Sequence, residues 1–260
     1  MHPVLLQIGS FKIFSYGTFV AVGFLVALWV SAREVDRLGI DRDKFYDLGM
    51  WLILSAIVGS RLFHVLVYWR EYAAAPSEIL KLWNGGLVFY GGLLAAVPVG
   101  YIFLRKNRIP FLPVADVSAV GIPLGLAFGR LGCTMAGCCF GKETGCPLSI
   151  TFTDPSSLAP LNVPLHPTQI YEALAGFAIA GLLYVTRDRF HTPGMRFWTM
   201  LILYGIARSS LEILRDDPRG FVGPFSESQI VSFVLILYAA TSIVFARRRA
   251  SGPGNGPGDG

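Results

Sequence analysis

Three arginines lie inside or at the edges of strongly apolar stretches of this chain: Arg61, Arg130 and Arg208. A charged side chain at the centre of a membrane helix costs about 2.5–3.5 kcal/mol on insertion scales. Arginines kept at such positions are candidates for a functional site or for a structural ion pair. For Arg61 we expect the side chain to snorkel outward, whereas Arg130 and Arg208 favour a polar cavity. Because guanidinium groups match phosphate oxygens, that cavity suits a phosphate-bearing lipid headgroup.

Other polar residues accompany these arginines at the same predicted level, in the outer half of the bilayer. One helical face carries Tyr204, Arg208, Glu212 and Arg215 at the spacing i, i+4, i+8 and i+11. Tyr16 and Tyr90 begin two apolar stretches, and the polar residues His166, Gln169, Tyr171 and Glu172 precede or begin another. Two alternatives remain: Arg208 and Glu212 form only an intrahelical pair, or the arginines line a proton- or anion-transport pathway.

The composition predicts a polytopic membrane protein that must position these residues. Of 260 residues, 53% are hydrophobic and only 15% charged, whereas soluble domains carry about 25% charged residues. The fold class is therefore all-α integral membrane, with about seven transmembrane helices of about 20 residues each. These are expected near residues 13–31, 47–69, 87–104, 114–130, 170–186, 197–214 and 229–246. This composition excludes a nucleic-acid-binding module and a disordered chain.

The distribution of Lys and Arg predicts the orientation. The loops after the first, third, fifth and seventh stretches carry about twice as many basic residues as the others, so they are expected in the cytoplasm. The N-terminus then lies outside and the C-terminus inside, with one larger outer-face segment near 132–167. Residues 1–250 are expected to form a single polytopic membrane domain, and the Gly/Pro-rich tail 251–260 is expected to be disordered.

All four cysteines, Cys133, Cys138, Cys139 and Cys146, fall in the predicted outer segment. In an oxidising compartment the simplest interpretation is one or two disulfides. Adjacent Cys138 and Cys139 can hardly pair with each other, so their partners would be Cys133 and Cys146, in an undetermined order. A zinc site that also uses His166 is a weaker alternative, and a catalytic thiol at Cys133 is weaker still. We therefore expect no metal centre.

Several separate motifs occur in order along nearly the whole chain, from Tyr16 to Gln229. They are Gly59-Ser-Arg-Leu62, Trp83-Asn-Gly-Gly-Leu-Val-Phe-Tyr-Gly-Gly92, Asp116, Gly129-Arg-Leu-Gly132, Gly141, His166-Pro-Thr-Gln-Ile-Tyr-Glu172 and Tyr204-Gly-Ile-Ala-Arg-Ser-Ser-Leu-Glu-Ile-Leu-Arg215. Together these motifs resemble the prolipoprotein diacylglyceryl transferase family. A single Gly-Arg-Leu-Gly would carry no such information.

The resemblance implies a multi-pass enzyme of the bacterial inner membrane that performs the first step of lipoprotein maturation. The family moves the diacylglyceryl group of phosphatidylglycerol onto the lipobox cysteine thiol of a prolipoprotein. A thioether forms, glycerol phosphate leaves, and no cofactor is required. The implied partners are phosphatidylglycerol, prolipoprotein signal peptides and the lipid bilayer, with no nucleic acid. Arg130 matches the family's headgroup-binding arginine and Arg208 its second essential arginine; the further substrate-binding positions are Tyr16, Gly141, Glu212 and Arg215.

Two positions depart from the family pattern. Tyr90 stands where the family commonly has the histidine proposed to activate the thiol, and Cys133 stands where it has an asparagine. The unperturbed pKa of tyrosine is about 10, against about 6.5 for histidine. Either Tyr90 takes the proton as tyrosinate, or the base lies elsewhere, or the thiolate forms unaided. Two alternatives to the family reaction are a divergent paralogue with another acceptor and a non-catalytic lipid-binding or transport protein.

Overall fold

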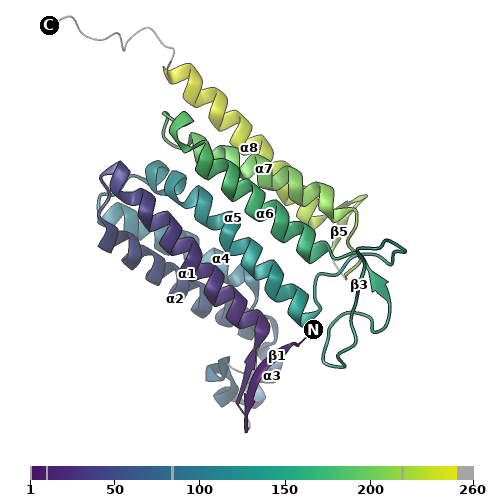
Figure 1. Cartoon of the computed structure of the whole chain (residues 1–260). Helices are drawn as coiled ribbons and strands as arrows, with labels where there is room; N and C mark the ends of the chain where they lie inside the picture. The colour runs from purple at the N-terminus through teal and green to yellow at the C-terminus, as the bar shows by residue number, and fades with distance from the viewer. Residues whose placement is uncertain (1, 10, 83–84, 218–219, 251–260) are drawn as a thin grey trace, which may run out of the picture. The chain divides into compact units, whose positions relative to one another are not determined.

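The computed structural model describes residues 2–9, 11–82, 85–217 and 220–250, and long helices dominate it (Figure 1). Seven α-helices in these residues have 18 or more residues, and each covers most of one predicted apolar stretch. They are α1 (Ser15–Val35), α2 (Arg42–Val67), α4 (Phe89–Lys106), α5 (Phe111–Ala136), α6 (Thr168–Val185), α7 (Met195–Glu212) and α8 (Glu227–Ala250). The predicted tail 251–260 lies outside the described residues.

Five helical segments in the described part of the chain are long and apolar enough to cross a membrane. These are Ser15–Leu38, Arg42–Val67, Phe111–Ala136, Thr168–Val185 and Glu227–Arg249. Large apolar side chains such as Leu237 and Phe245 on α8 are exposed, as lipid-facing residues would be. The expectation of an all-α membrane protein is confirmed, while the number of spans and the orientation stay predictions.

Helix ends differ from the predicted ones where local capping extends a helix beyond its apolar stretch. The helix α5 continues six residues past the expected end at 130, to Ala136, and stops at Gly137, whose φ is 76°. Only glycine adopts this left-handed conformation without a Cβ penalty. The connection to α6 therefore begins at 137 rather than 132. At its other end, α2 begins at Arg42 because the Asp41 side chain accepts from the backbone N–H groups of Asp43 and Lys44.

Short elements connect the long helices, and sequence reasoning did not predict them. The strands pair antiparallel as β1 (Val4–Ile8) with β2 (Phe11–Phe14), β3 (Ile150–Thr151) with β4 (Pro164–Leu165), and β5 (Phe221–Val222) with β6 (Phe225–Ser226). In the first hairpin Gln7 lies opposite Lys12. Shorter helices in the described part of the chain are η1 (Asp36–Leu38), α3 (Trp69–Ala74), η2 (Pro76–Leu80) and η4 (Arg187–Arg189).

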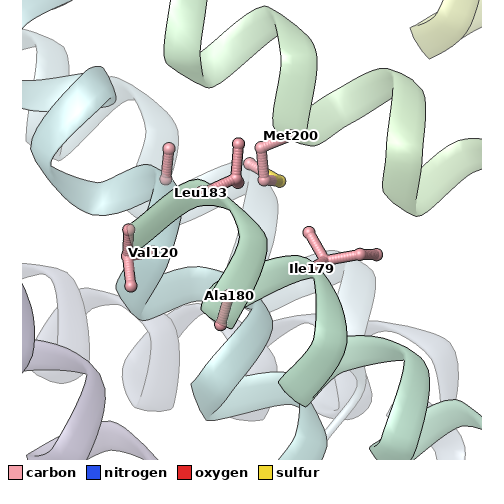
Figure 2. Packing of buried hydrophobic residues seen from close by; sticks show 6 residues of the cluster. Val120, Ile179, Ala180, Leu183 and Met200 are labelled. Atoms are coloured by element: carbon pink, nitrogen blue, oxygen red, sulfur yellow. The ribbon is translucent and has the colours of Figure 1, made fainter. Parts of the chain in front are cut away.

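The chain divides into two compact units, one formed by Met1–Ser31 and Ala115–Gly260 and the other by Ala32–Val114. In the first unit, a buried apolar cluster joins three helices: Ala119 and Val120 come from α5, Ile179, Ala180 and Leu183 from α6, and Met200 from α7 (Figure 2). Gly176 lets α6 approach α5 closely, because a Cβ there would lie 2.8 Å from the Pro123 carbonyl oxygen. This packing fixes the three helices that carry most of the predicted polar site.

Asp116, a residue of one family-like motif, fixes the start of α7 from α5. Its carboxylate accepts hydrogen bonds from the backbone N–H groups of Gly194, at 2.5 Å, and Phe197, at 2.8 Å. A carboxylate at a helix N-terminus satisfies free N–H groups and interacts favourably with the helix dipole. Since Arg130 lies on α5 and Arg208 on α7, this cap helps to align the helices of the two arginines.

In the second unit, α2 packs against α4 through small residues, and Arg61 organises the segment between them. A Cβ on Gly59 would lie 2.3 Å from the Ala95 Cβ, so the two helices are in close contact. The Arg61 guanidinium donates to the carbonyl oxygens of Ile79, Gly85, Gly86, Glu78 and Lys81 at 2.5–3.4 Å. The expectation that Arg61 snorkels outward is therefore wrong: its side chain is buried and holds backbone carbonyls.

Candidate functional site

Glu172, in the first turns of α6, lies at the centre of a buried ion-pair network. Its Oε2 lies 2.8 Å from Nε of Arg130 on α5. Its Oε1 accepts from Nη1 of Arg215 at 2.9 Å and lies 3.8 Å from Nη1 of Arg208 on α7. Burial of isolated charges is costly, and such groups persist when they are paired and hydrogen-bonded. One carboxylate thus holds three guanidinium groups together at one end of the helices α5, α6 and α7.

The stripe predicted on α7 contributes a second carboxylate to this network. Arg208 Nη1 donates to Oε2 of Glu212, and Arg208 Nη2 donates to the Ser228 hydroxyl at 2.9 Å. The other oxygen of Glu212 accepts from the Ser226 hydroxyl at 2.6 Å. Ser226 and Ser228 lie at the start of α8, so three helices and two buried carboxylates fix the position of Arg208. The intrahelical pair is real, but it is only one part of a wider network.

Arg215 is held just after α7 by a third carboxylate. Its Nε and Nη2 donate to the two oxygens of Asp217, each at 3.0 Å, which is the fork geometry of a bidentate pair. Its backbone forms a bridge with Gly141. A Cβ on Gly141 would lie 2.7 Å from the carbonyl oxygen of His166 and 2.8 Å from that of Leu214. Glycine is required at 141 because two backbone segments approach it this closely.

The three guanidinium groups differ in how many of their N–H donors are still available for a ligand. The Arg215 side chain is 5% exposed and uses Nε, Nη1 and Nη2 on Asp217 and Glu172. The Arg208 side chain is 10% exposed, and both of its Nη groups have partners. The Arg130 side chain is 20% exposed and pairs through Nε, so its two Nη groups can receive another acceptor. Arg130 is therefore the arginine best placed to bind an anion that enters the network.

Tyr16 and Cys133 lie beside Arg130. Tyr16 begins α1 and contacts α5, since a Cβ on Gly132 would lie 3.2 Å from the Tyr16 carbonyl oxygen. The Tyr16 hydroxyl lies within electrostatic range of Arg130 and of the Cys133 sulfur. The network thus carries an aromatic hydroxyl and a thiol at its border, beside guanidinium groups of the kind that match a phosphate.

Comparison with known proteins identifies the family. The prolipoprotein diacylglyceryl transferase family profile matches residues 3–245. The chain belongs to this family. A phosphatidylglycerol–prolipoprotein diacylglyceryl transferase of Clostridium tetani is 34% identical over 237 residues, covering 91% of this chain and 94% of the relative. The protein of the same name from Bacillus anthracis is 34% identical over 256 residues, covering 95% and 93%. A Clostridium perfringens relative, numbered 2 in its name, is 33% identical over 237 residues.

Six of the predicted site residues lie in the first unit of this prolipoprotein diacylglyceryl transferase family member. Arg130, Arg208, Glu212 and Arg215 share one ion-pair network, and Gly141 and Tyr16 border it. Tyr90 belongs to the second unit. It is the second residue of α4, half exposed, with its ring edge-on to Phe89 at 5.9 Å. The roles assigned to these residues by family resemblance stay predictions.

Of the acids and hydroxyls that hold the arginines, the predicted site residues include Glu212 but not Glu172, Asp217, Ser226 or Ser228. Glu172 is one of the polar residues that precede or begin an apolar stretch, and a carboxylate at such a position is a usable signal of a site. Asp217, Ser226 and Ser228 lie in or after a polar loop, where hydrophilic residues are ordinary. Their contacts with Arg215, Glu212 and Arg208 depend on the path of that loop, which no local pattern encodes.

The four cysteines are free thiols in the structure, and three of them gather at the end of α5. The sulfur atoms of Cys133, Cys138 and Cys139 lie within 4.8 Å of one another. Hydrogen bonds with the sulfurs of Cys133 and Cys138, together with the positive charge of Arg130, lower the pKa of Cys139 from its ordinary value. Cys146 is not in this group. The predicted disulfides and their pairing order stay predictions.

Proposed function

We propose that this protein transfers the diacylglyceryl group of phosphatidylglycerol to the lipobox cysteine thiol of prolipoproteins, the first step of lipoprotein maturation. The observation that carries the proposal is Arg130, which keeps two donor groups available inside a network that fixes it in place. Phosphatidylglycerol presents a phosphate that a guanidinium fork matches. The names of the Clostridium and Bacillus relatives give the same donor and acceptor class.

The membrane placement is part of this proposal. The seven long helices span the bacterial inner membrane as a single polytopic domain over residues 1–250, with the N-terminus outside and the C-terminus in the cytoplasm. The excess of basic residues in alternate loops supports this orientation, because loops rich in Lys and Arg stay in the cytoplasm. The ion-pair network then faces the outer leaflet, where a prolipoprotein presents the cysteine that follows its signal peptide.

The reaction is a displacement at the glycerol carbon that carries the phosphate. The acceptor sulfur forms a bond to this carbon while the bond from carbon to the phosphate oxygen breaks. The bonding electrons leave with glycerol phosphate, and the thiol proton goes to a base. Negative charge grows on the leaving phosphate, and donors aimed in advance at that charge are the main catalytic contribution. We assign this role to Arg130, with Arg208 as the second cation.

The other residues have distinct parts in this proposal. Tyr16 and Gly141 border the phosphatidylglycerol site, Gly141 by allowing the close approach of its backbone to that of Arg215. Glu212 and Arg215 hold the cations and carboxylates in their relative positions. Tyr90 is the candidate acceptor of the thiol proton, because it stands where the family commonly has the histidine proposed for that role. A thiol with a pKa of about 8.5 is also ionised to a few per cent near neutral pH, so loss of Tyr90 slows the reaction without stopping it.

The test is a transfer assay with purified protein, phosphatidylglycerol and a lipobox peptide, followed by mass spectrometry of the peptide. We expect a gain of one diacylglyceryl unit that is absent when the peptide cysteine is changed to serine. Arg130→Ala and Arg208→Ala should abolish the gain, while Arg248→Ala, at the exposed end of α8, should retain it. Full activity in both arginine variants would contradict the headgroup role.

The departures at Tyr90 and Cys133 favour a second candidate, a paralogue that transfers the group to another acceptor. A peptide without mass gain, beside a histidine-bearing family member that is active in the same assay, would support this candidate. If the lipobox peptide stays unmodified, release of glycerol phosphate from phosphatidylglycerol in membranes that contain the protein would then identify a transfer to a different nucleophile.

A further inference from the structure

Three cysteine sulfurs converge where α5 ends, and neither the proposed reaction nor the family resemblance assigns them a role. Cys133 is buried in the last turns of α5, and Cys138 and Cys139 follow in the next loop. Their sulfurs lie within 4.8 Å of one another, and among the described residues this is the group of His, Cys, Asp and Glu side chains with the geometry to hold a metal ion.

The backbone folds back at Gly137 to bring the cysteines together. The N–H groups of Gly137 and Cys138 both donate to the Cys133 carbonyl oxygen, at 2.9 and 3.2 Å. This pattern and the positive φ of Gly137 close the end of α5. Cys139 also has a positive φ, 61°, a conformation that costs a non-glycine residue about 1 kcal/mol or more. The turn therefore places Cys138 and Cys139 over Cys133 against a local backbone preference.

Two buried side chains of α6 hold this turn in place. Thr168 Oγ1 donates to the Cys139 carbonyl oxygen at 2.8 Å, and Gln169 Nε2 donates to the Cys138 carbonyl oxygen at 2.9 Å. Both side chains are fully buried. Because these bonds attach the turn to a packed helix, the three sulfurs are arranged before any ligand arrives. Pre-arranged ligands are what a metal site needs in order to bind without a large ordering cost.

The dimensions of the group fit a soft metal. With zinc–sulfur bonds of about 2.3 Å, two sulfurs on a tetrahedral zinc lie about 3.8 Å apart. The three sulfurs of this protein lie within 4.8 Å of one another, which is compatible with this separation. Four residues separate Cys133 from Cys138, which is within the usual range of two to four for zinc ligands. Thiolate ligands select zinc, copper(I) and similar thiophilic cations over magnesium or calcium.

We propose that Cys133, Cys138 and Cys139 bind one thiophilic cation of the Zn²⁺ type. Three thiolates and one divalent cation carry a net charge of −1. Arg130 and Arg215 lie within electrostatic range of Cys139 and offset this charge. Three protein ligands leave the fourth tetrahedral position for water or another donor, as in catalytic rather than structural zinc sites. This proposal revises the expectation of no metal centre and does not depend on the proposed transfer reaction.

The test uses the full chain, purified in detergent with a phosphine reductant and freed of metal with a chelator. Titration with Co²⁺ as the probe should produce thiolate-to-cobalt absorption that saturates at about one cobalt per chain, and added Zn²⁺ should remove it by competition. Elemental analysis after gel filtration should likewise find about one zinc per chain. Cys133→Ser, Cys138→Ser and Cys139→Ser should each lose the absorption, whereas the matched control Cys146→Ser should keep it.

Folding of each variant is checked by its metal-free thermal unfolding, so that loss of the site is distinguished from loss of the protein. As a second measurement, Zn²⁺ should raise the unfolding temperature of the wild type and of Cys146→Ser but not that of folded Cys139→Ser. Equal cobalt absorption in a cluster variant and in the wild type would overturn the proposal. So would a disulfide between two of the three cysteines, detected after alkylation of the protein in its native membrane.

Discussion

Replacing Glu172 by glutamine tests whether one carboxylate holds the three arginines in their working positions. Glutamine keeps the size of the side chain and one carbonyl oxygen that accepts hydrogen bonds. Its NH₂ group replaces the second carboxylate oxygen and cannot accept one. In the structure both carboxylate oxygens accept, one from Arg215 at 2.9 Å and the other facing Arg130 at 2.8 Å. The variant must therefore lose one of these two charge-assisted contacts and the negative charge between them.

The expected magnitude follows from the contacts that remain. A hydrogen bond to a charged group contributes about 1.5–3 kcal/mol, and an uncompensated buried charge costs about 3–5 kcal/mol. Arg208 and Arg215 keep Glu212 and Asp217 as counter-charges, so the loss falls mainly on Arg130. We expect Glu172→Gln to lower the free energy of unfolding by about 2–3 kcal/mol. This value is close to the loss of one charge-assisted hydrogen bond, because two of the three arginines keep a counter-charge.

Transfer should slow because Arg130 no longer points at the leaving phosphate. A loss of about 2.7 kcal/mol of transition-state stabilisation corresponds to about a hundredfold decrease in kcat. The KM for phosphatidylglycerol should not rise, because removal of a negative charge leaves the site more attractive to an anionic lipid. The measurement is the initial rate of transfer to a lipobox peptide at varied phosphatidylglycerol, with the residual folded fraction determined for each preparation.

A matched control is Glu71→Gln, which removes an exposed carboxylate from α3 and should leave both constants unchanged. A folded Glu172→Gln protein with the kcat of the wild type would refute the positioning role of Glu172. A large increase in KM with unchanged kcat would also refute it, since the ion pair would then serve only to bind the lipid.

Two further predictions test other parts of the site. Tyr90→Phe should lose most of its kcat and Tyr90→His should retain activity, both measured by peptide mass gain; equal rates in Tyr90→Phe and the wild type would remove this hydroxyl from the mechanism. Gly141→Ala should destabilise the protein by about 1–3 kcal/mol in thermal unfolding, because the new Cβ would lie 2.8 Å from the Leu214 carbonyl oxygen, whereas Gly145→Ala has open space and should be neutral.

The long helices were predictable because runs of apolar residues raise the hydropathy of the sequence. The residues at which the helices end, and the way in which one helix is aligned with the next, were not predictable. The end of α5 depends on Gly137 and not on the last apolar residue of the run. The start of α7 depends on Asp116, 78 residues before Gly194 in the sequence. A contact of this range carries no local signature, so the motif containing Asp116 could be noticed but its capping role could not be derived.

The arginines of the site were predictable because charge inside an apolar run is conspicuous, but their individual roles were not. Arg61 and Arg130 both lie inside or at the edge of an apolar stretch, and the sequence predicted the wrong environment for Arg61. In the structure Arg61 donates to backbone carbonyl groups, whereas Arg130 pairs with a carboxylate and keeps donors available. Only the partners distinguish a structural arginine from one that can bind a ligand, and these partners come from distant segments of the chain.

The charge balance of the network explains how a membrane protein can keep three arginines together and still bind an anion. Arg130, Arg208 and Arg215 are matched by Glu172, Glu212 and Asp217, so the free site is neutral and its charges stay compensated during folding. An entering phosphate need not displace a carboxylate, because the Nη groups of Arg130 are still available. In the proposed mechanism, the negative charge that grows on the leaving group then meets the guanidinium of Arg130, which the network already holds in position. In this proposal the carboxylates do more than neutralise the arginines, because arginines held in advance need less reorganisation during the reaction than free ones.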